Sequence, residues 1–273
     1  MSGHITGPIT INPRSIGVTK PLLEISGLCL NFRALKVLTD IHLTIPEGQV
    51  VSVIGPNGAG KTSLLNCISG RYRPSAGSIR FDGRELVAMS AANRAALGIS
   101  RTFQNLALFR HMSVIDNILI GRHRRFRQNT LLDGFFWGPS RRAEIHAREE
   151  VEHLIDLLEM QSLRDKIAGT LAYGQQKKVE LARALALSPR LLLLDEPMAG
   201  MTFTEKEDMA KYILHINRTM GTTIAMIEHD MRVVMDLSEA VTVLSFGQVI
   251  AHGTPDEVIA DPDVQRSYLG ADE

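Results

Sequence analysis

The sequence is poor in the residues that mark secreted or membrane-spanning proteins. Its 273 residues include two cysteines, Cys29 and Cys67, and only 5% are aromatic. Two thiols in separate predicted elements do not make a disulfide framework. We therefore expect both cysteines to be small buried apolar residues of a protein in a reducing compartment. The longest purely aliphatic run, residues 191–194, is far shorter than the about 20 residues that a membrane-spanning helix needs. The chain therefore has no predicted membrane span.

An excess of charge of either sign is also lacking. Thirty basic residues balance thirty acidic ones, so no overall field favours nucleic acid or anionic lipid, and no nucleic-acid partner is expected. Residues 1–20 lack the charged and apolar regions of a signal peptide, and their composition predicts a disordered tail. These absences favour a cytoplasmic protein that needs a partner for any work at a membrane.

Short β-rich runs alternate with helical patterns from residue 22 onward. This alternation predicts an α/β fold in which helices cover both faces of a mainly parallel sheet. Residues 113–165 are strongly helical, which indicates a lobe inserted between two halves of the core. We predict one domain over residues 21–273, with a core of about 21–104 and 168–273 and an inserted helical subdomain of about 105–167.

A glycine-rich loop lies between a predicted buried strand and a predicted helix. Its sequence, GPNGAGKT, matches GxxxxGK[ST], in which successive backbone N–H groups face a phosphate at a helix N-terminus. Lys61 is expected to neutralise charge on the β- and γ-phosphates, and the Thr62 hydroxyl to hold Mg²⁺. The predicted nucleotide-binding residues are Gly55, Pro56, Asn57, Gly58, Ala59, Gly60, Lys61, Thr62 and Ser63.

Two acidic residues follow a second predicted buried strand, RLLLLDE. An acid at the carboxyl end of such a strand is the expected Mg²⁺-associated aspartate of a P-loop enzyme, which predicts that role for Asp195. Glu196 directly after it is a suitable general base for the attacking water. No NKxD-like segment is present, which disfavours GTP. Phe32 is the candidate for stacking on adenine, and a core aromatic in a strand is the alternative for this residue.

Three further segments complete a family pattern. The sequence LAYGQQKKVELARAL is similar to the LSGGQ signature of ABC ATPases and the helix that follows it. Gln104 stands at the position of the Q-loop glutamine of that family, and His229 at that of its switch histidine. Five elements in this order identify the chain as a member of the ABC ATPase family. Among its members, ATPase subunits of branched-chain amino acid importers are the most similar, through LAYGQQ, EPMAGM, residues 122–142 and the ending SYLG.

The resemblance implies a P-loop NTPase core with a mainly parallel sheet, an N-terminal antiparallel β subdomain and an inserted helical subdomain. It implies ATP hydrolysis with Mg²⁺ in a head-to-tail dimer with a second ATPase subunit, either the same chain or a paralogue. It also implies transmembrane permease subunits at the inner face of the cell membrane, and a periplasmic or extracellular binding protein if the transporter is an importer.

The resemblance also assigns roles to single residues. Gln104 would contact Mg²⁺ or water, and His229 would contact the γ-phosphate. The helix N-terminus at the signature would attract the phosphate bound by the other subunit. The signature residues that would reach this ATP are Ala172, Tyr173, Gly174 and Gln175.

The chain departs from the family pattern at two positions. Ala172 replaces the usual signature serine, and Thr202 stands where many relatives have Asp or Asn.

The alternatives to an amino acid importer are a soluble ABC ATPase of DNA repair or translation and the ATPase of a transporter for another substrate. Residues 122–142, basic and aromatic, form either a membrane-contacting surface or, as we favour, a solvated basic face with packed aromatics.

Overall fold

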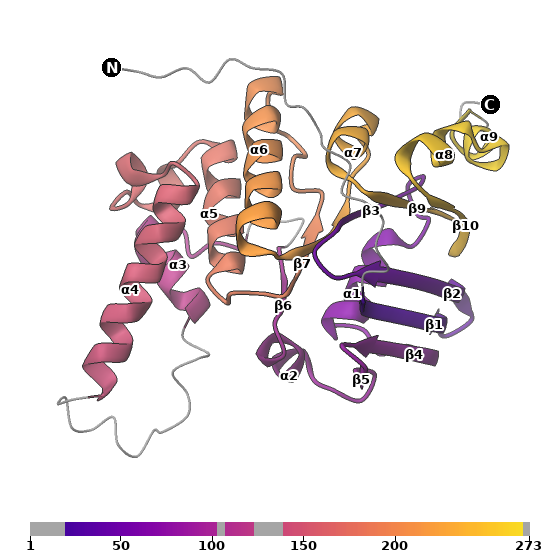
Figure 1. The fold of residues 1–273 in the computed structure, drawn as a ribbon, viewed down its shortest axis with the longest axis horizontal. Helices are drawn as coiled ribbons and strands as arrows, with labels where there is room; N and C mark the ends of the chain where they lie inside the picture. Colours follow the sequence, from indigo (N-terminus) through magenta and orange to yellow (C-terminus); the bar gives the residue numbers. More distant parts are fainter. Residues whose placement is uncertain (1–19, 103–106, 123–138, 270–273) are drawn as a thin grey trace.

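The structure is a computed structural model that describes residues 20–102, 107–122 and 139–269 (Figure 1). Strands form two sheets, and helices pack against the larger one. The strands are β1 (Pro21–Phe32), β2 (Leu35–Pro46), β3 (Val50–Ile54), β4 (Ala76–Phe81), β5 (Arg84–Glu85), β6 (Ile99–Arg101), β7 (Leu191–Asp195), β8 (Thr223–Ile227), β9 (Ala240–Ser245) and β10 (Gln248–Gly253).

Helices cover both sides of the larger sheet, and two short helices form the C-terminal part of the chain. In chain order they are α1 (Lys61–Ser69), α2 (Ala91–Ala96), α3 (Val114–Arg122), α4 (Pro139–Leu157), α5 (Tyr173–Leu185), α6 (Phe203–Met220), α7 (Met231–Leu237), α8 (Pro255–Ala260) and α9 (Pro262–Leu269). Two short 3₁₀ turns, Gln161–Leu163 and Ala168–Thr170, lie between α4 and α5. Within the described ranges, no helix is both long and apolar enough to cross a bilayer.

The larger sheet has the order β10-β9-β3-β8-β7-β6, and its strands are parallel except for β10. Every residue of β3, β7 and β8 is buried, because both faces of these central strands are covered. Parallel strands of this kind place their carboxyl ends at one edge of the sheet. The P-loop, Asp195 and the segment before His229 follow three neighbouring strands, so the fold brings them to the same edge.

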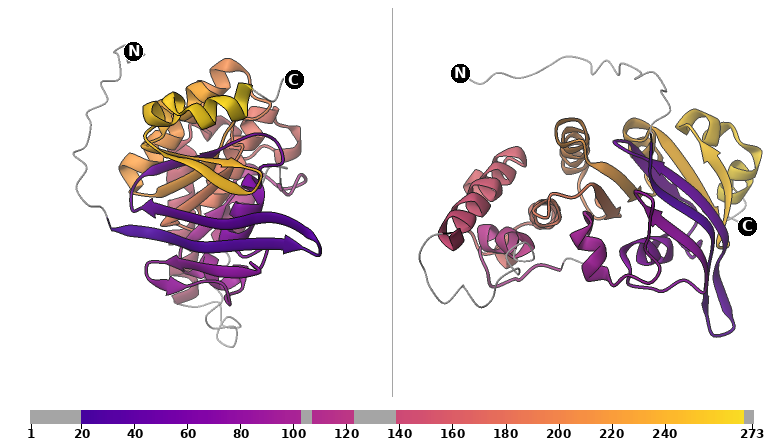
Figure 2. Two further views of the ribbon diagram at one scale, coloured as in Figure 1. Left: turned by 90° about the vertical axis from the view of Figure 1, so that its right-hand side faces the viewer. Right: turned by 60° about the horizontal axis from the view of Figure 1, so that its bottom comes forward.

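Alternate residues of the central strands belong to two different cores. In β7, Leu191 and Leu193 pack with α1 and the antiparallel sheet, whereas Leu192 and Leu194 pack with α3, α5 and α6. Figure 2 shows the antiparallel sheet on one side of the larger sheet and the helices α3 to α6 on the other. This division arises because successive side chains of a strand point to opposite faces of the sheet.

The smaller sheet has the order β2-β1-β4-β5 and is antiparallel throughout. It is the N-terminal β subdomain that the resemblance implied. Helices α3, α4 and α5 and the 3₁₀ turn at Leu163 pack in one core together with α6 and alternate residues of β7 and β8. The helices of the predicted insertion therefore continue into the core of the larger sheet, and the predicted bounds of the helical subdomain stay a prediction. Residues 1–19 of the predicted tail, Gln104 and residues 123–138 of the 122–142 segment lie outside the described residues. Cys67 is buried, Cys29 is partly buried, and both are free thiols, as predicted.

The far end of α1 from the P-loop is held by a buried arginine. Arg94, only 1% exposed, donates from its guanidinium to the carbonyl oxygens of Cys67 at 2.5 Å and Ile68 at 2.9 Å. A cation at this end of the helix also complements the helix dipole. Gly70, with φ 82, ends the helix beside it in the left-handed conformation that glycine adopts most easily.

We expect Arg94→Met to lower the free energy of unfolding by about 2 kcal/mol, because the last carbonyls of α1 lose a charged donor. Urea unfolding measures the change. Arg84→Met is the control: this exposed residue lies in β5, and its change is expected within about 0.5 kcal/mol of wild type. Equal stability of the two variants would contradict a role for Arg94 in holding α1.

Candidate functional site

The P-loop turns sharply between the end of β3 and the start of α1. Gly55, Gly58 and Gly60 have φ angles of 145°, 81° and 100°, a region that residues with a Cβ rarely occupy. A Cβ on Gly55 would also collide with the backbone carbonyl of Leu244, so the loop has no room for a side chain there. This backbone path turns the loop onto the N-terminus of α1, which is the geometry of a phosphate cradle.

Lys61 begins α1 and folds back over the loop. Its ammonium donates to the carbonyl oxygens of Gly55 at 2.7 Å and Pro56 at 2.9 Å. Burial lowers the pKa of Lys61, and the negative charges of Glu196 and Asp195 oppose that shift. The lysine therefore lies over the cradle, where its charge can meet a phosphate, and two acidic groups are near it.

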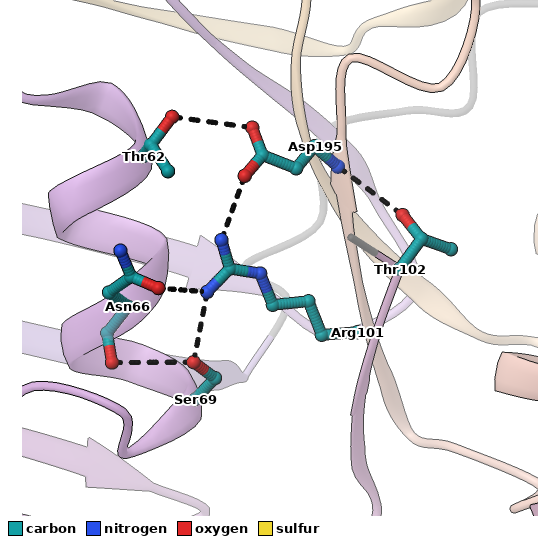
Figure 3. A network of polar contacts seen from close by, with 6 residues as sticks. All are labelled: Thr62, Asn66, Ser69, Arg101, Thr102 and Asp195. Atoms are coloured by element: carbon teal, nitrogen blue, oxygen red, sulfur yellow. Dashed lines mark hydrogen bonds and ion pairs between the residues drawn. The ribbon is translucent and has the colours of Figure 1, made fainter. Parts of the chain in front are cut away.

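The acid at the end of β7 faces the P-loop helix (Figure 3). Asp195 is 1% exposed, and its Oδ1 lies 3.5 Å from Oγ1 of Thr62. Its other oxygen, Oδ2, accepts a hydrogen bond of 2.8 Å from Arg101 at the end of β6. Its backbone N–H faces the Thr102 hydroxyl at 3.4 Å. The structure thus brings together Thr62 and Asp195, the hydroxyl and carboxylate that the sequence predicted to share a cation.

Glu196 and His229 follow two neighbouring strands at this edge. Glu196 has φ 50, unusual for a residue other than glycine, and its N–H donates to the carbonyl of Ile227 at 3.0 Å. The backbone is therefore turned at the residue predicted as general base. His229, two residues after the end of β8, has a side chain that is 63% exposed, which leaves its imidazole open to a ligand or a second chain.

A buried carboxylate links these two segments. Glu228, 1% exposed, accepts hydrogen bonds from the N–H groups of Met198 at 3.1 Å and His229 at 3.2 Å. Burial raises the pKa of Glu228, and these N–H donors oppose the shift. Glu228 thereby ties the loop after Glu196 to the segment that carries His229.

The signature segment begins α5, and Ala172 occupies its N-cap position. Alanine has no side-chain acceptor, so α5 keeps only half of a capping box, in which the Ala172 N–H donates to Oε1 of Gln175 at 3.2 Å. Gly174 is buried against α6, where a Cβ would collide with the Glu205 carboxylate. Tyr173 is 43% exposed beside Gly200. The signature helix is thus packed but uncapped.

The signature and the P-loop lie on opposite faces of the larger sheet. Helix α5 belongs to the core that contains Leu192 and Leu194, whereas α1 belongs to the core that contains Leu191 and Leu193. Figure 1 shows the two helices on either side of β7. Within one chain the larger sheet therefore separates the two helices.

The unusual Thr202 has a structural role. It is the N-cap of α6, where its hydroxyl accepts from the Glu205 N–H at 3.4 Å and donates to Oε2 of Glu205 at 2.8 Å. Asp, Asn and Thr are all good N-cap residues. Replacement of Asp or Asn by Thr at this position therefore preserves the start of α6.

The structure says less about two other residues of the predicted nucleotide site, Phe32 and Gln104. Phe32, at the end of β1, is 45% exposed, and its ring meets Tyr72 edge-on at 5.1 Å between centroids. An exposed ring is not the core aromatic that was the alternative, while stacking on adenine stays a prediction. Gln104 lies outside the described residues, so its roles also stay predictions.

Sequence reasoning missed Arg101 and Glu228. Glu228 directly follows the buried strand β8, and the rule that selected Asp195 at the end of RLLLLDE would have selected it as well. Arg101 gave a weaker signal, a charged residue in the short strand β6. Only the pairing of β6 with β7 shows that it reaches Asp195.

We expect Ala172→Ser to raise the free energy of unfolding by about 1 kcal/mol, because serine supplies the missing N-cap acceptor of α5. Ala172→Val has no acceptor and is expected to bring no gain. Chemical denaturation of both variants measures the difference. If serine and valine changed stability alike, the N-terminus of α5 would not be limited by its cap.

Known proteins share this arrangement. A family model described as ABC transporter matches residues 38–199, and one described as branched-chain amino acid ATP-binding cassette transporter matches residues 248–273. BraF of Pseudomonas aeruginosa, a high-affinity branched-chain amino acid transport ATP-binding protein, is 41% identical over 93% of this chain and 99% of its own. LivG of Escherichia coli, which carries the same description, is 37% identical over 93% of this chain and 99% of its own.

Solved structures agree with the sequence matches. A nucleotide-free ATP-binding cassette from an ABC transporter superposes with a TM-score of 0.80 at 29% identity, over 91% of this chain and 99% of that one. The ADP conformation of an ABC transporter cassette gives 0.80 at 30% identity, over 92% of this chain and all of the other. The P-loop, the acid pair after β7 and the signature helix thus occur in a chain that belongs to the ABC transporter family as an ATPase subunit.

Proposed function

We propose that this chain hydrolyses ATP to energise a membrane transporter that imports branched-chain or related amino acids. The observation that carries the chemistry is the meeting of Thr62, Asp195 and Glu196 at the end of β7 beside the P-loop. The similarity to BraF and LivG over nearly the whole chain supports the substrate class.

The residues beside the P-loop fit a magnesium ion. A threonine hydroxyl and a carboxylate oxygen 3.5 Å apart are hard oxygen ligands, which Mg²⁺ prefers, and phosphate oxygens of the nucleotide would add others. Thr62 and Asp195 would hold the ion, with Gln104 as a third proposed contact. When bound, Mg²⁺ supplies positive charge to the phosphates.

The chain's own groups then carry hydrolysis. The P-loop N–H groups and Lys61 orient the triphosphate, and Lys61 offsets the negative charge that spreads over the transferring phosphoryl group. Glu196 polarises the water that attacks in line with the leaving oxygen. His229 contacts the γ-phosphate, and Phe32 stacks on adenine.

A second ATPase subunit completes the site. The N-terminus of α5, at residues 172–175, would face the γ-phosphate bound by the P-loop of its partner. The placement of α1 and α5 on opposite faces of the sheet supports this head-to-tail dimer. Closure around two ATP molecules and reopening after hydrolysis would be the mechanical output.

We expect Glu196→Gln to retain ATP binding and lose at least about a hundredfold in steady-state hydrolysis, because an amide is a poor proton acceptor. Glu207→Gln on the exposed face of α6 is the control and should hydrolyse ATP at the wild-type rate. Nucleotide binding and phosphate release are measured on the same preparations. Near-normal hydrolysis by Glu196→Gln would reject Glu196 as general base.

A groove beside β6 is the proposed docking site for a cytoplasmic helix of the permease subunit. It has a volume of about 300 Å³, and apolar side chains from three segments of the chain line part of it: Phe109, Ile120, Ala184 and Leu187. Phe109 is 50% exposed, so it is not part of the helical core. Binding there would keep this subunit at the inner face of the membrane through its partner.

The wall of the groove is held rigidly. Asn117 of α3 accepts from the Phe109 N–H at 2.9 Å and donates to the Phe109 carbonyl at 3.0 Å. Ser113 caps α3, since its hydroxyl accepts from the Asp116 N–H at 3.2 Å. The exposed ring is thus presented from a fixed backbone, which suits a docking surface.

We expect Phe109→Asp to abolish assembly with the permease subunits while ATP binding by the isolated chain persists, because a charged carboxylate would replace the apolar ring against which the partner helix is proposed to pack. Ile259→Asp is the control, since Ile259 is 40% exposed on α8, away from the groove. Co-purification of the membrane subunits gives the result. Wild-type assembly of Phe109→Asp would reject this docking site.

The transport function itself is tested in cells. In a strain that lacks this chain, uptake of labelled leucine, isoleucine or valine should fall and should return with the wild-type chain but not with Glu196→Gln. Unchanged uptake of all three would reject the proposed substrate class. Failure of this chain to co-purify with any membrane protein would favour a soluble ABC ATPase instead.

A further inference from the structure

Arg101 is a buried cation whose place in the site follows from no sequence motif. Its side chain is 7% exposed, and that of its ion-pair partner Asp195 is 1% exposed. The guanidinium bridges three elements (Figure 3): Nη2 donates to Oδ2 of Asp195 at 2.8 Å, and Nη1 donates to Oδ1 of Asn66 at 2.6 Å and faces the Ser69 hydroxyl at 3.2 Å. Strand β6, strand β7 and helix α1 therefore meet at this one side chain.

A buried ion pair of this kind is poorly explained by stability alone. Removing two charges from water costs several kcal/mol for each ion, and an apolar pair of similar volume is often as stable. Asp195 cannot be apolar in the proposed site, because its carboxylate faces the Thr62 hydroxyl. A buried carboxylate without a cation beside it would be strongly unfavourable, so the site needs a positive charge even when it holds no metal ion.

Arg101 supplies this positive charge without blocking the side of Asp195 that faces the P-loop. The two carboxylate oxygens are divided, with Oδ2 on Arg101 and Oδ1 toward Thr62. Lys61 also lies near enough to Asp195 to feel its charge, and its ammonium donates to the carbonyl oxygens of Gly55 and Pro56. Asn66 and the guanidinium fork hold Arg101 in place, so its geometry does not depend on a bound ligand.

We propose that Arg101 is a positioning residue that acts through Asp195. It neutralises the carboxylate while the site is without metal, and it holds Oδ2 so that Oδ1 stays directed at Thr62 for a divalent cation. The inference rests on the proposed nucleotide site and adds a residue that the family motifs do not contain.

The proposal makes nucleotide binding depend on metal in a specific way. Without Arg101 and without metal, the uncompensated charge of Asp195 repels the phosphates of a nucleotide. A divalent cation replaces the missing positive charge, so it recovers much of the loss. The ratio of the ADP dissociation constant in EDTA to that in Mg²⁺ is therefore expected to rise when the charge of Arg101 is removed.

Full-length wild-type chain and three variants test this, with ADP affinity measured calorimetrically in EDTA and in Mg²⁺. Arg101→Met should raise the ratio at least about tenfold over wild type, equivalent to about 1.4 kcal/mol. Arg101→Lys keeps the charge and should stay within about threefold of wild type. Arg94→Met is the matched control: it removes another buried arginine that bonds to α1, at the opposite end from Thr62, and should leave the ratio unchanged.

An unchanged or lower ratio in Arg101→Met would overturn the proposal and leave Arg101 a structural bridge. If Arg101→Met does not fold, the double variant Arg101→Met/Asp195→Asn decides, because it removes both buried charges. Recovery of folded protein would support the counter-charge role, and failure to recover would overturn it. Absence of ADP binding by the wild-type chain would instead reject the proposed nucleotide site.

Discussion

Burial of the central strands on both faces is the constraint on which the rest of the molecule depends. Strands β3, β7 and β8 expose no residue. One set of alternate side chains meets α1 and the antiparallel sheet, and the other set meets α3 to α6 or, at Ile54, a smaller core with α7 and α8. Parallel sheets occur with both faces covered in this way, and the parallel order of these strands brings three strand ends to one edge. The P-loop, the acid pair at Asp195 and the segment of Glu228 and His229 are neighbours for that reason.

Polar groups at this edge are held by partners rather than left to solvent. Asp195 lies between Thr62 and Arg101, and Glu228 accepts N–H groups from two segments. In a region of low dielectric such partners set the charge and direction of each group before a ligand arrives. Pre-organisation of this kind is what the proposed phosphoryl chemistry needs, because its main demand is placement of charge.

The same two-sided packing separates the motifs that must cooperate. The P-loop helix and the signature helix pack on opposite faces of the larger sheet, an arrangement that fits the proposed head-to-tail dimer. The groove beside Phe109 lies next to β6, the strand that carries Arg101 to the acid of the nucleotide site. The proposed partner surface and the proposed chemical site are thus joined through one edge strand.

The sequence by itself determined the class of fold, the family and most of the site. Glycine spacing, an aliphatic run that ends in acids, and the signature are local patterns whose chemistry can be understood from neighbouring residues. The departures at Ala172 and Thr202 were also visible, although only the structure shows that one leaves a helix uncapped and the other caps the next helix.

Only the tertiary structure decided which distant charged and polar groups become partners. Arg101 reaches Asp195 because β6 pairs with β7, although 94 positions separate the two residues along the chain. Glu228 meets the N–H of Met198 because β8 lies beside β7. Strand pairing between remote segments depends on how the whole sheet is covered, and no local pattern of residues encodes it.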